Sequence, residues 1–269
     1  VGERLMPALC SIPMLEEWLQ ACLASNEAHP AALHFDTGIN RLGFRLNEAS
    51  IVKRMIDAIG YKPQMIMSHL ACADDPPHPL NARQRDAFAA VRARLPGVPA
   101  SLANSSGIFL GDGFTHDLVR PGIALYGGNP LPGSPNPMRA VAHLEGTVMQ
   151  VRNVKVGETV GYSATWEAKR PSRVAVLGAG YKDGVPRALS SKQGDGPAQV
   201  FINGRRCPVI GRISMDMMAA DITDLMPHSV VRGTRAEILG SHILIDEAAS
   251  WAGTISYELL TRLGSRYAR

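Results

Sequence analysis

The sequence of 269 residues lacks the features that mark several specialised classes of protein. No window approaches the roughly 18 uninterrupted apolar residues of a membrane helix. Its four cysteines show neither C-x-x-C spacing nor a His-rich neighbourhood, which argues against a zinc site or a disulfide scaffold. These absences argue against a membrane protein and favour a cytoplasmic location, with reduced and mostly buried thiols.

Neither sign of charge dominates the sequence. The 28 basic and 24 acidic residues give a net charge of +4, and they are spread thinly rather than in blocks. This balance predicts no nucleic-acid partner. Internal repeats and low-complexity tracts are absent as well. The start, Val1-Gly2-Glu3, has no signal-peptide pattern and resembles the middle of a longer chain.

What is present in the first half is an alternation of strand-like and helix-like segments about 30 residues apart, typical of right-handed βαβ units. The predicted strands are residues 31–35, 64–71, 99–103 and 118–126, and the predicted helices are residues 15–24, 48–59 and 81–95. A complete α/β barrel needs about 250 residues. Residues 1–128 therefore predict about half of one.

A segment rich in proline and glycine, residues 129–137, interrupts this pattern and predicts a linker. Residues 138–269 then show short β-like runs with turn signals, including a hairpin at Asn203-Gly204, and two late helical stretches. The predicted fold class is α/β: a partial TIM-like (β/α) barrel followed by a mostly β C-terminal domain.

The strand at residues 31–35 is followed by Asp36-Thr37-Gly38 and then by a turn that contains Arg41. A guanidinium held at a strand end suits two-point capture of a small carboxylate. On this stretch alone, an ordinary surface arginine is an equally good interpretation.

Further candidate residues follow the other predicted strands, at the rim where α/β barrels gather their functional groups. They are His69, Asn104, Ser105, Arg120, Gly122 and Ile123. Backbone N–H groups of Gly122 and Ile123, with the Ser105 hydroxyl, could hold a phosphate. Taken alone, Gly122 is better explained by simple turn chemistry.

Six stretches resemble, in the same order, motifs of the alanine racemases. They are residues 34–43 (H-F-D-T-G-I-N-R-L-G), 68–71 (S-H-L-A), 103–105 (A-N-S), 120–127 (R-P-G-I-A-L-Y-G), 160–165 (V-G-Y-S-A-T) and 211–216 (G-R-I-S-M-D). The resemblance covers nearly the whole chain, and the joint order of the motifs is far more specific than any one of them.

This resemblance implies a pyridoxal 5'-phosphate (PLP) enzyme that interconverts L- and D-alanine by a two-base mechanism, for cell-wall synthesis. It also implies a homodimer whose sites are shared between subunits. Tyr162 would be a catalytic base contributed to the partner subunit. Arg41 and Met215 would bind the amino-acid substrate, and Tyr181 would line the site entrance. The cofactor contacts would be Arg120 at the ring nitrogen, with His69, Asn104, Ser105, Gly122 and Ile123.

Three departures from the family pattern qualify this expectation. No segment resembles the one that carries the family's Schiff-base lysine, and the lysines at 53, 62, 155, 169, 182 and 192 lie in other contexts. His34 replaces a lysine that is often carbamylated, and Ser265 stands where some relatives have a phosphate-contacting tyrosine.

We therefore expect a preceding segment on the order of 90 residues, or three βα units, and no racemisation by these 269 residues alone. A non-catalytic remnant, a PLP-binding module and a racemase of broader specificity are the alternatives.

Overall fold

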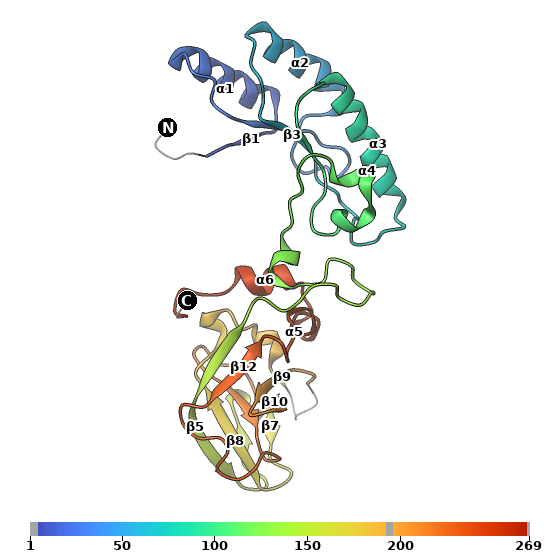
Figure 1. Ribbon diagram of the computed structural model, residues 1–269. Helices are drawn as coiled ribbons and strands as arrows, with labels where there is room; N and C mark the ends of the chain where they lie inside the picture. The colour runs from blue at the N-terminus through green and yellow to red at the C-terminus, as the bar shows by residue number, and fades with distance from the viewer. Residues whose placement is uncertain (1–4, 192–195, 268–269) are drawn as a thin grey trace. The chain divides into compact units, whose positions relative to one another are not determined.

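The computed structural model describes residues 5–191 and 196–267, which divide into two compact units (Figure 1). The first unit runs to Gly122 and includes Pro130–Pro135. The second unit consists of Ile123–Asn129 and the described residues from Asn136 onward. Each unit has its own hydrophobic core.

Four short strands of the first unit pair in parallel in the order β1-β2-β3-β4. Their bounds are Ala8–Leu9, Ala32–His34, Met65–Met67 and Ala100–Ser101. The strands alternate with helices α1 (Ile12–Ser25), α2 (Ala49–Ala58) and α3 (Pro79–Arg94), which lie along one side of the sheet (Figure 1). Shorter helices are η1 (Leu46–Glu48), η2 (Gly107–Leu110) and α4 (Asp112–Thr115). The predicted partial TIM-like barrel is confirmed.

Burial follows from the sequence pattern. On α1, the buried residues Leu15, Leu19 and Cys22 recur every three to four positions and form one stripe. That stripe packs in the same core as Leu33 of β2 and Ile66 of β3, both fully buried. The strands are mostly apolar, as expected for a covered parallel sheet, and their buried polar residues are His34 and Ser101.

Two local predictions in this unit are wrong. The helix predicted to begin at residue 81 begins earlier, at Pro79: the His78 side chain accepts a hydrogen bond from the Leu80 N–H, and Asn81 lies buried inside the helix. Residues 118–126 do not form a strand. The Leu118 and Arg120 N–H groups donate to backbone carbonyls beside β4, but Pro121 has no N–H and the chain turns into η3 (Ile123–Tyr126).

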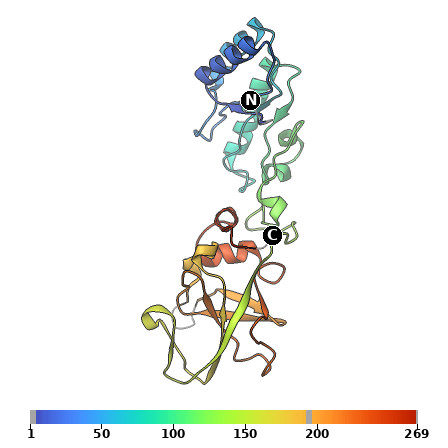
Figure 2. The ribbon, with the colours of Figure 1, turned by 90° about the vertical axis from the view of Figure 1, so that its left-hand side faces the viewer.

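The second unit is built around a closed antiparallel barrel with strand order β10-β11-β8-β5-β12-β9. The bounds are Leu144–Val154 for β5, Ser172–Leu177 for β8, Gln199–Ile202 for β9, Arg205–Ile210 for β10, Met218–Asp221 for β11 and Arg235–Leu239 for β12. Figure 2 shows the long strand β5, in yellow-green, along the side of this barrel. The mostly β character is confirmed, whereas β11, β12 and the closure of the barrel were not predicted.

The second unit also contains shorter strands and helices outside this barrel. They are the strand pair β6 (Thr159–Val160) and β7 (Trp166–Glu167), the 3-10 helices η4 (Tyr162–Ala164), η5 (Tyr181–Asp183) and η6 (Arg187–Leu189), and the helices α5 (Ile245–Ala252) and α6 (Ser256–Thr261). The β9–β10 hairpin turns at Asn203 and Gly204, whose φ angles of 45° and 84° are those of the predicted turn.

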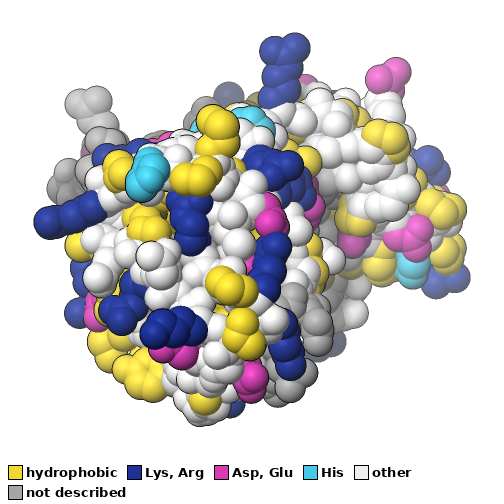
Figure 3. Space-filling model, turned by 90° about the horizontal axis from the view of Figure 1, so that it is seen from below, with side chains coloured by type: hydrophobic (Ala, Val, Ile, Leu, Met, Phe, Trp, Pro, Cys, Tyr) yellow, Lys and Arg dark blue, Asp and Glu magenta, His cyan; other side chains and the backbone are white. Residues whose placement is uncertain are grey.

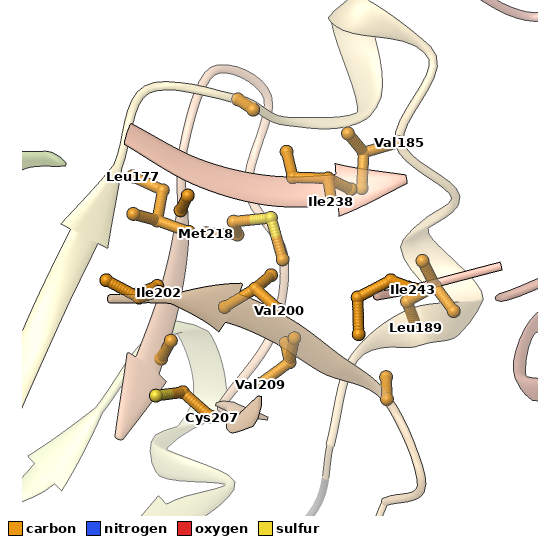
Figure 4. Close-up of a cluster of buried hydrophobic side chains, with 14 of the residues drawn as sticks. Leu177, Val185, Leu189, Val200, Ile202, Cys207, Val209, Met218, Ile238 and Ile243 are labelled. Atoms are coloured by element: carbon orange, nitrogen blue, oxygen red, sulfur yellow. The ribbon is translucent and has the colours of Figure 1, made fainter. Parts of the chain in front are cut away.

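Inward-facing side chains from different strands fill the interior of this barrel. Figure 4 shows Leu177, Met218, Val200 and Val209 directed into one cluster, and each of them is almost completely buried. The closed sheet leaves no long unpaired edge around this core. The core is therefore a packed interior that fixes the loops at the barrel ends.

Two global features bear on function. No helix in residues 5–191 and 196–267 is both long and apolar enough to cross a membrane. On the face shown in Figure 3, Lys and Arg side chains are interspersed with acidic and hydrophobic ones rather than gathered in one field.

Candidate functional site

The loop after β2 is a rigid support for Arg41. One carboxylate oxygen of Asp36 accepts hydrogen bonds from the backbone N–H groups of residues 38–40, at 2.8, 3.0 and 3.2 Å. Gly43 has a φ of 132°, and a Cβ there would lie 2.6 Å from the Asp36 nitrogen, so a larger residue would not fit. The loop thus closes on itself and presents Arg41 at its exposed tip.

A buried glutamine joins this loop to the one after β3. The Gln84 side chain on α3 is fully buried, and its Nε2 donates to Thr37 Oγ1 at 3.1 Å and to the His69 carbonyl at 2.9 Å. Its Oε1 accepts from the Ala71 N–H at 2.8 Å. Gln84 therefore fixes the positions of Arg41's loop and His69 together. The sequence reasoning missed this residue; its only signal was a polar side chain within a helix.

Arg120 lies beside the ends of β3 and β4. Its guanidinium donates to the Ser101 hydroxyl and to the Ser68 carbonyl, and burial lowers its pKa. The Arg120 backbone N–H donates to the Ala103 carbonyl at 3.0 Å, which fixes the segment along β4. The side chain is thus held by two neighbouring strand ends.

Two histidines complete an edge cluster, which we define as His34, Arg41, His69 and Arg120. Burial lowers the pKa of His69, and the charges of Arg120 and Arg41 lower it further. Burial and the Arg120 charge likewise lower the pKa of His34. Two neutral rings beside two guanidinium groups make an environment that favours anions. In the described residues, no group of three or more His, Cys, Asp or Glu side chains could hold a metal ion.

A polar turn follows β4. The Ser105 hydroxyl, which is almost fully buried, accepts a hydrogen bond from the Gly122 N–H at 2.7 Å. Asn104 has a local function, because its Oδ1 accepts from the Gly107 N–H at 2.9 Å and so stabilises the start of η2. The structure brings Ser105 and Gly122 together, and their role in holding a phosphate stays a prediction.

In the second unit, the Ile123 N–H donates to the hydroxyl of Tyr257 on α6 at 3.3 Å. The sequence reasoning did not single out Tyr257 and looked for a tyrosine at Ser265 instead. Ser265 lies beyond α6, in the turn next to Arg266. The sequence feature that could have indicated Tyr257 is its position at the start of a short C-terminal helix.

Tyr162 lies in the turn after β6, with 68% of its surface exposed. The turn is fixed against the segment after β10: a Cβ on Gly161 would lie 3.0 Å from the Arg212 nitrogen, and Arg212 donates to the Ser163 hydroxyl at 3.1 Å. Ser163 has a φ of 61°, an uncommon conformation that accommodates this tight turn.

Tyr181 and Met215 lie on two loops that are hydrogen-bonded to each other. The Tyr181 N–H donates to the Ser214 carbonyl at 3.1 Å, and the Lys182 N–H donates to the Met215 carbonyl at 3.0 Å. A Cβ on Gly180 would lie 2.3 Å from the Met215 oxygen, so this approach requires glycine. Both side chains are close to half exposed. Because residues 211–212 also contact the Tyr162 turn, Tyr162, Tyr181 and Met215 form one exposed face, which we call the tyrosine–methionine face.

An ion-pair network supports this face. The Asp183 carboxylate, almost fully buried, accepts from Arg266 Nε at 2.7 Å and Nη2 at 2.8 Å, and from the Gly180 N–H at 3.0 Å. Arg266 also pairs with Asp216 at 2.8 Å. The hydrogen bonds from Arg266 lower the pKa of Asp183.

The predicted site residues thus fall into two groups. Arg41, His69, Asn104, Ser105, Arg120 and Gly122 belong to the first unit, and Ile123, Tyr162, Tyr181 and Met215 belong to the second. In the described residues, no hydrogen bond joins the side chains of His69 and Arg120; Arg120 binds Ser101 and Ser68 instead. No described lysine lies at the carboxyl end of β1 to β4, and Lys192 lies outside the described residues.

A partial α/β barrel followed by a closed β barrel defines a class of two-domain α/β proteins. Within that class the comparisons are specific. The family model for the alanine racemase N-terminal domain matches residues 1–130, and the model for the alanine racemase C-terminal domain matches residues 141–269. The chain belongs to the alanine racemase family.

Individual relatives agree. The alanine racemase of Methylobacterium nodulans is 49% identical over 265 residues, which are 98% of this chain and 70% of that protein. The biosynthetic alanine racemase of Agrobacterium fabrum is 42% identical over 272 residues, covering 98% of this chain and 69% of that protein.

Among solved structures, the alanine racemase of Bartonella henselae with covalently bound pyridoxal phosphate aligns with a TM-score of 0.87 and 39% identity, over 99% of this chain and 73% of that one.

Proposed function

We propose that this chain contributes the catalytic, substrate-binding and cofactor-binding residues of a PLP-dependent alanine racemase that works as a homodimer by two bases. The observation that carries the proposal is the edge cluster at the strand ends, next to the Ser105–Gly122 turn, in a chain of this family. A role in supplying D-alanine for the cell wall, in the cytoplasm, completes the proposal.

The residues present fit the cofactor, which carries a phosphate and other anionic groups. In the first unit, the Gly122 N–H donates to the Ser105 hydroxyl, in a turn of the kind that binds phosphate oxygens. In the second unit, the Ile123 N–H donates to the Tyr257 hydroxyl. His69 and Asn104 are proposed to line the same cofactor site. When bound, pyridoxal phosphate withdraws electrons from the amino-acid α-carbon and so acidifies its proton.

Arg120 would contact the cofactor's ring nitrogen. A guanidinium keeps its proton near neutral pH, so Arg120 would donate a hydrogen bond to that nitrogen without protonating it. Ser101 and Ser68 hold the group in place. This contact would limit electron withdrawal and favour return of the proton to the α-carbon over transamination.

Arg41 would bind the substrate carboxylate. Its loop is fixed by Asp36 and by Gln84, so a two-point contact would cost little ordering of the backbone. Neutral His69 nearby leaves the guanidinium free of competition from a carboxylate.

Tyr162 would be the base on one face of the α-carbon. Its side chain is largely exposed within its own chain, which suits a residue that reaches into a partner subunit's site. Tyr181 and Met215 lie on the same face and would line the entrance to that site. A phenol has a reference pKa near 10, so the site must stabilise the phenolate for Tyr162 to act as a base.

We propose no lysine of this chain as the residue that links the cofactor covalently. That observation favours the second candidate function, a PLP-binding module without racemase activity. Borohydride reduction with PLP, followed by peptide mapping, would show whether any lysine of the chain is labelled.

Exchange of the α-proton tests the proposal. In the PLP-loaded enzyme in D₂O, Tyr162→Phe should slow exchange from L-alanine by roughly 10²–10⁴-fold, the usual contribution of a general base, and slow exchange from D-alanine far less. Tyr181→Phe, on the same face, is the matched control and should not produce this asymmetry. Equal losses for the two enantiomers would refute the role of Tyr162.

A further inference from the structure

His34 has an unsatisfied nitrogen in the middle of the edge cluster. The side chain lies at the carboxyl end of β2 and is only 8% exposed. Its Nε2 atom is buried and has no hydrogen-bond partner among the residues that the structure describes. Leaving a buried polar atom unpaired costs free energy. The unpaired Nε2 atom therefore indicates a hydrogen-bond partner that binds it in the working enzyme.

Cys10 determines which ring nitrogen of His34 carries the proton. Parallel pairing of β1 with β2 sets Ala8 beside Ala32 and Leu9 beside Leu33, and the same offset brings Cys10 to His34. The Cys10 thiol donates its one proton to the Ala8 carbonyl at 3.3 Å. Its sulfur, 3.8 Å from His34 Nδ1, can then only accept. This places the His34 proton on Nδ1 and leaves Nε2 as a bare acceptor.

The surroundings keep the ring neutral. Burial lowers the pKa of His34 most, and the charge of Arg120 lowers it further. Asp36 opposes this with an effect smaller than that of Arg120, and the charge of Arg41 adds a smaller lowering effect. The other titratable groups facing it are Cys10 and His69, and neither supplies an anion. One carboxylate oxygen of Asp36 already accepts three backbone hydrogen bonds. Nε2 is thus a neutral acceptor among cationic donors.

We propose that His34, held by Cys10 with its proton on Nδ1, accepts a hydrogen bond from the Arg41 guanidinium through Nε2 and so orients Arg41 toward the substrate carboxylate. His34 is then a positioning residue, and this inference rests on the proposed function of Arg41.

Nitrogen NMR of the full chain, labelled with ¹⁵N-histidine, tests both contacts without any measurement of activity. The His34 signals are assigned by their loss in His34→Gln. Wild type should show a protonated Nδ1 and an unprotonated Nε2. Cys10→Ala should shift the ring toward protonated Nε2, and Cys10→Ser, which still offers an acceptor, should restore the wild-type pattern. A protonated Nε2 in wild type would overturn the proposal.

The contact with Arg41 is tested in the same spectra. Arg41→Gln should move the Nε2 resonance, whereas Arg45→Gln, on an exposed position of the same loop region, should leave it in place. Equal shifts in the two variants, or none in either, would overturn the assignment of Arg41 as donor.

Kinetics of the PLP-loaded enzyme give a second readout. His34→Leu should raise KM for alanine by roughly 10-fold or more, the effect of losing a hydrogen bond to a charged group, with a smaller change in kcat. Unchanged KM in His34→Leu would refute the positioning role. Failure of the complete, PLP-loaded enzyme to racemise alanine would instead refute the proposed function, and the NMR result would stand.

Discussion

The buried amide of Gln84 provides the sharpest test of how the first unit holds its site. Gln84→Met keeps the length and volume of the side chain but removes one acceptor and two donor hydrogens. The Ala71 N–H and the His69 carbonyl would then lose their partner, whereas Thr37 keeps its 2.7 Å contact with the Ser68 hydroxyl.

The magnitude follows from this count. Each buried polar group left unpaired costs about 1–3 kcal/mol, and the low end applies because both hydrogen bonds are only part-buried, so two of them predict a loss of roughly 2 kcal/mol in the free energy of unfolding. A unit of this size loses roughly 4 °C in Tm for each kcal/mol, which gives about 8 °C. Denaturant unfolding and thermal scans measure both quantities, and amide hydrogen exchange at Ala71 should accelerate more than exchange elsewhere in the unit.

Gln20→Met is the matched control, because Gln20 lies on the exposed side of α1. Exposed substitutions usually stay within about 0.5 kcal/mol. If Gln84→Met and Gln20→Met changed stability equally, or if Ala71 kept its protection, Gln84 would not be joining the two loops as the structure indicates.

Two further predictions concern the substrate loop and the ion-pair network. Arg41→Lys should raise KM for alanine, because an ammonium cannot make a two-point contact with a carboxylate; steady-state kinetics with Arg45→Lys as control would check this, and wild-type KM would exclude the carboxylate role. The lowered pKa of Asp183 means that its stabilising contribution is present above the unfolded-state value of about 3.9 and is lost as the pH falls through the folded-state value. Asp183→Asn should therefore lose stability at neutral pH and show a weaker acid dependence in unfolding measurements between pH 2 and 6; an unchanged acid profile would contradict the Arg266 pairing.

The large elements could be predicted because they are encoded by local periodicity. The β2 strand and helices α1 to α3 follow from apolar spacing and from the turn at Asp36, and the hairpin at Asn203 follows from its sequence alone. The segment at residues 118–126 was misread because its apolar content resembles a strand. What decides its structure is Pro121, which interrupts the ladder beside β4.

The candidate site was only partly predictable. Motif residues such as Arg120 and Ser105 could be named from sequence, but their partners could not. Gln84 reaches the loop after β2 across 47 positions, and Arg266 reaches Asp183 across 83. Such contacts depend on how elements pack, and no local spacing encodes them.

Cys10 and His34 show the same limit in its simplest form. The sequence alone names the histidine just before the Arg41 loop, and its residue type does not show that it could orient Arg41. The parallel register of β1 and β2 changes that conclusion, because it places a thiol 24 positions earlier against Nδ1 and thereby makes Nε2 an acceptor. An acceptor at that point can orient a guanidinium without bearing a charge. The effect of His34 on Arg41 therefore depends on the pairing of β1 with β2. A variant that changes Cys10 and leaves His34 intact separates the effect of this pairing from the effect of the histidine itself.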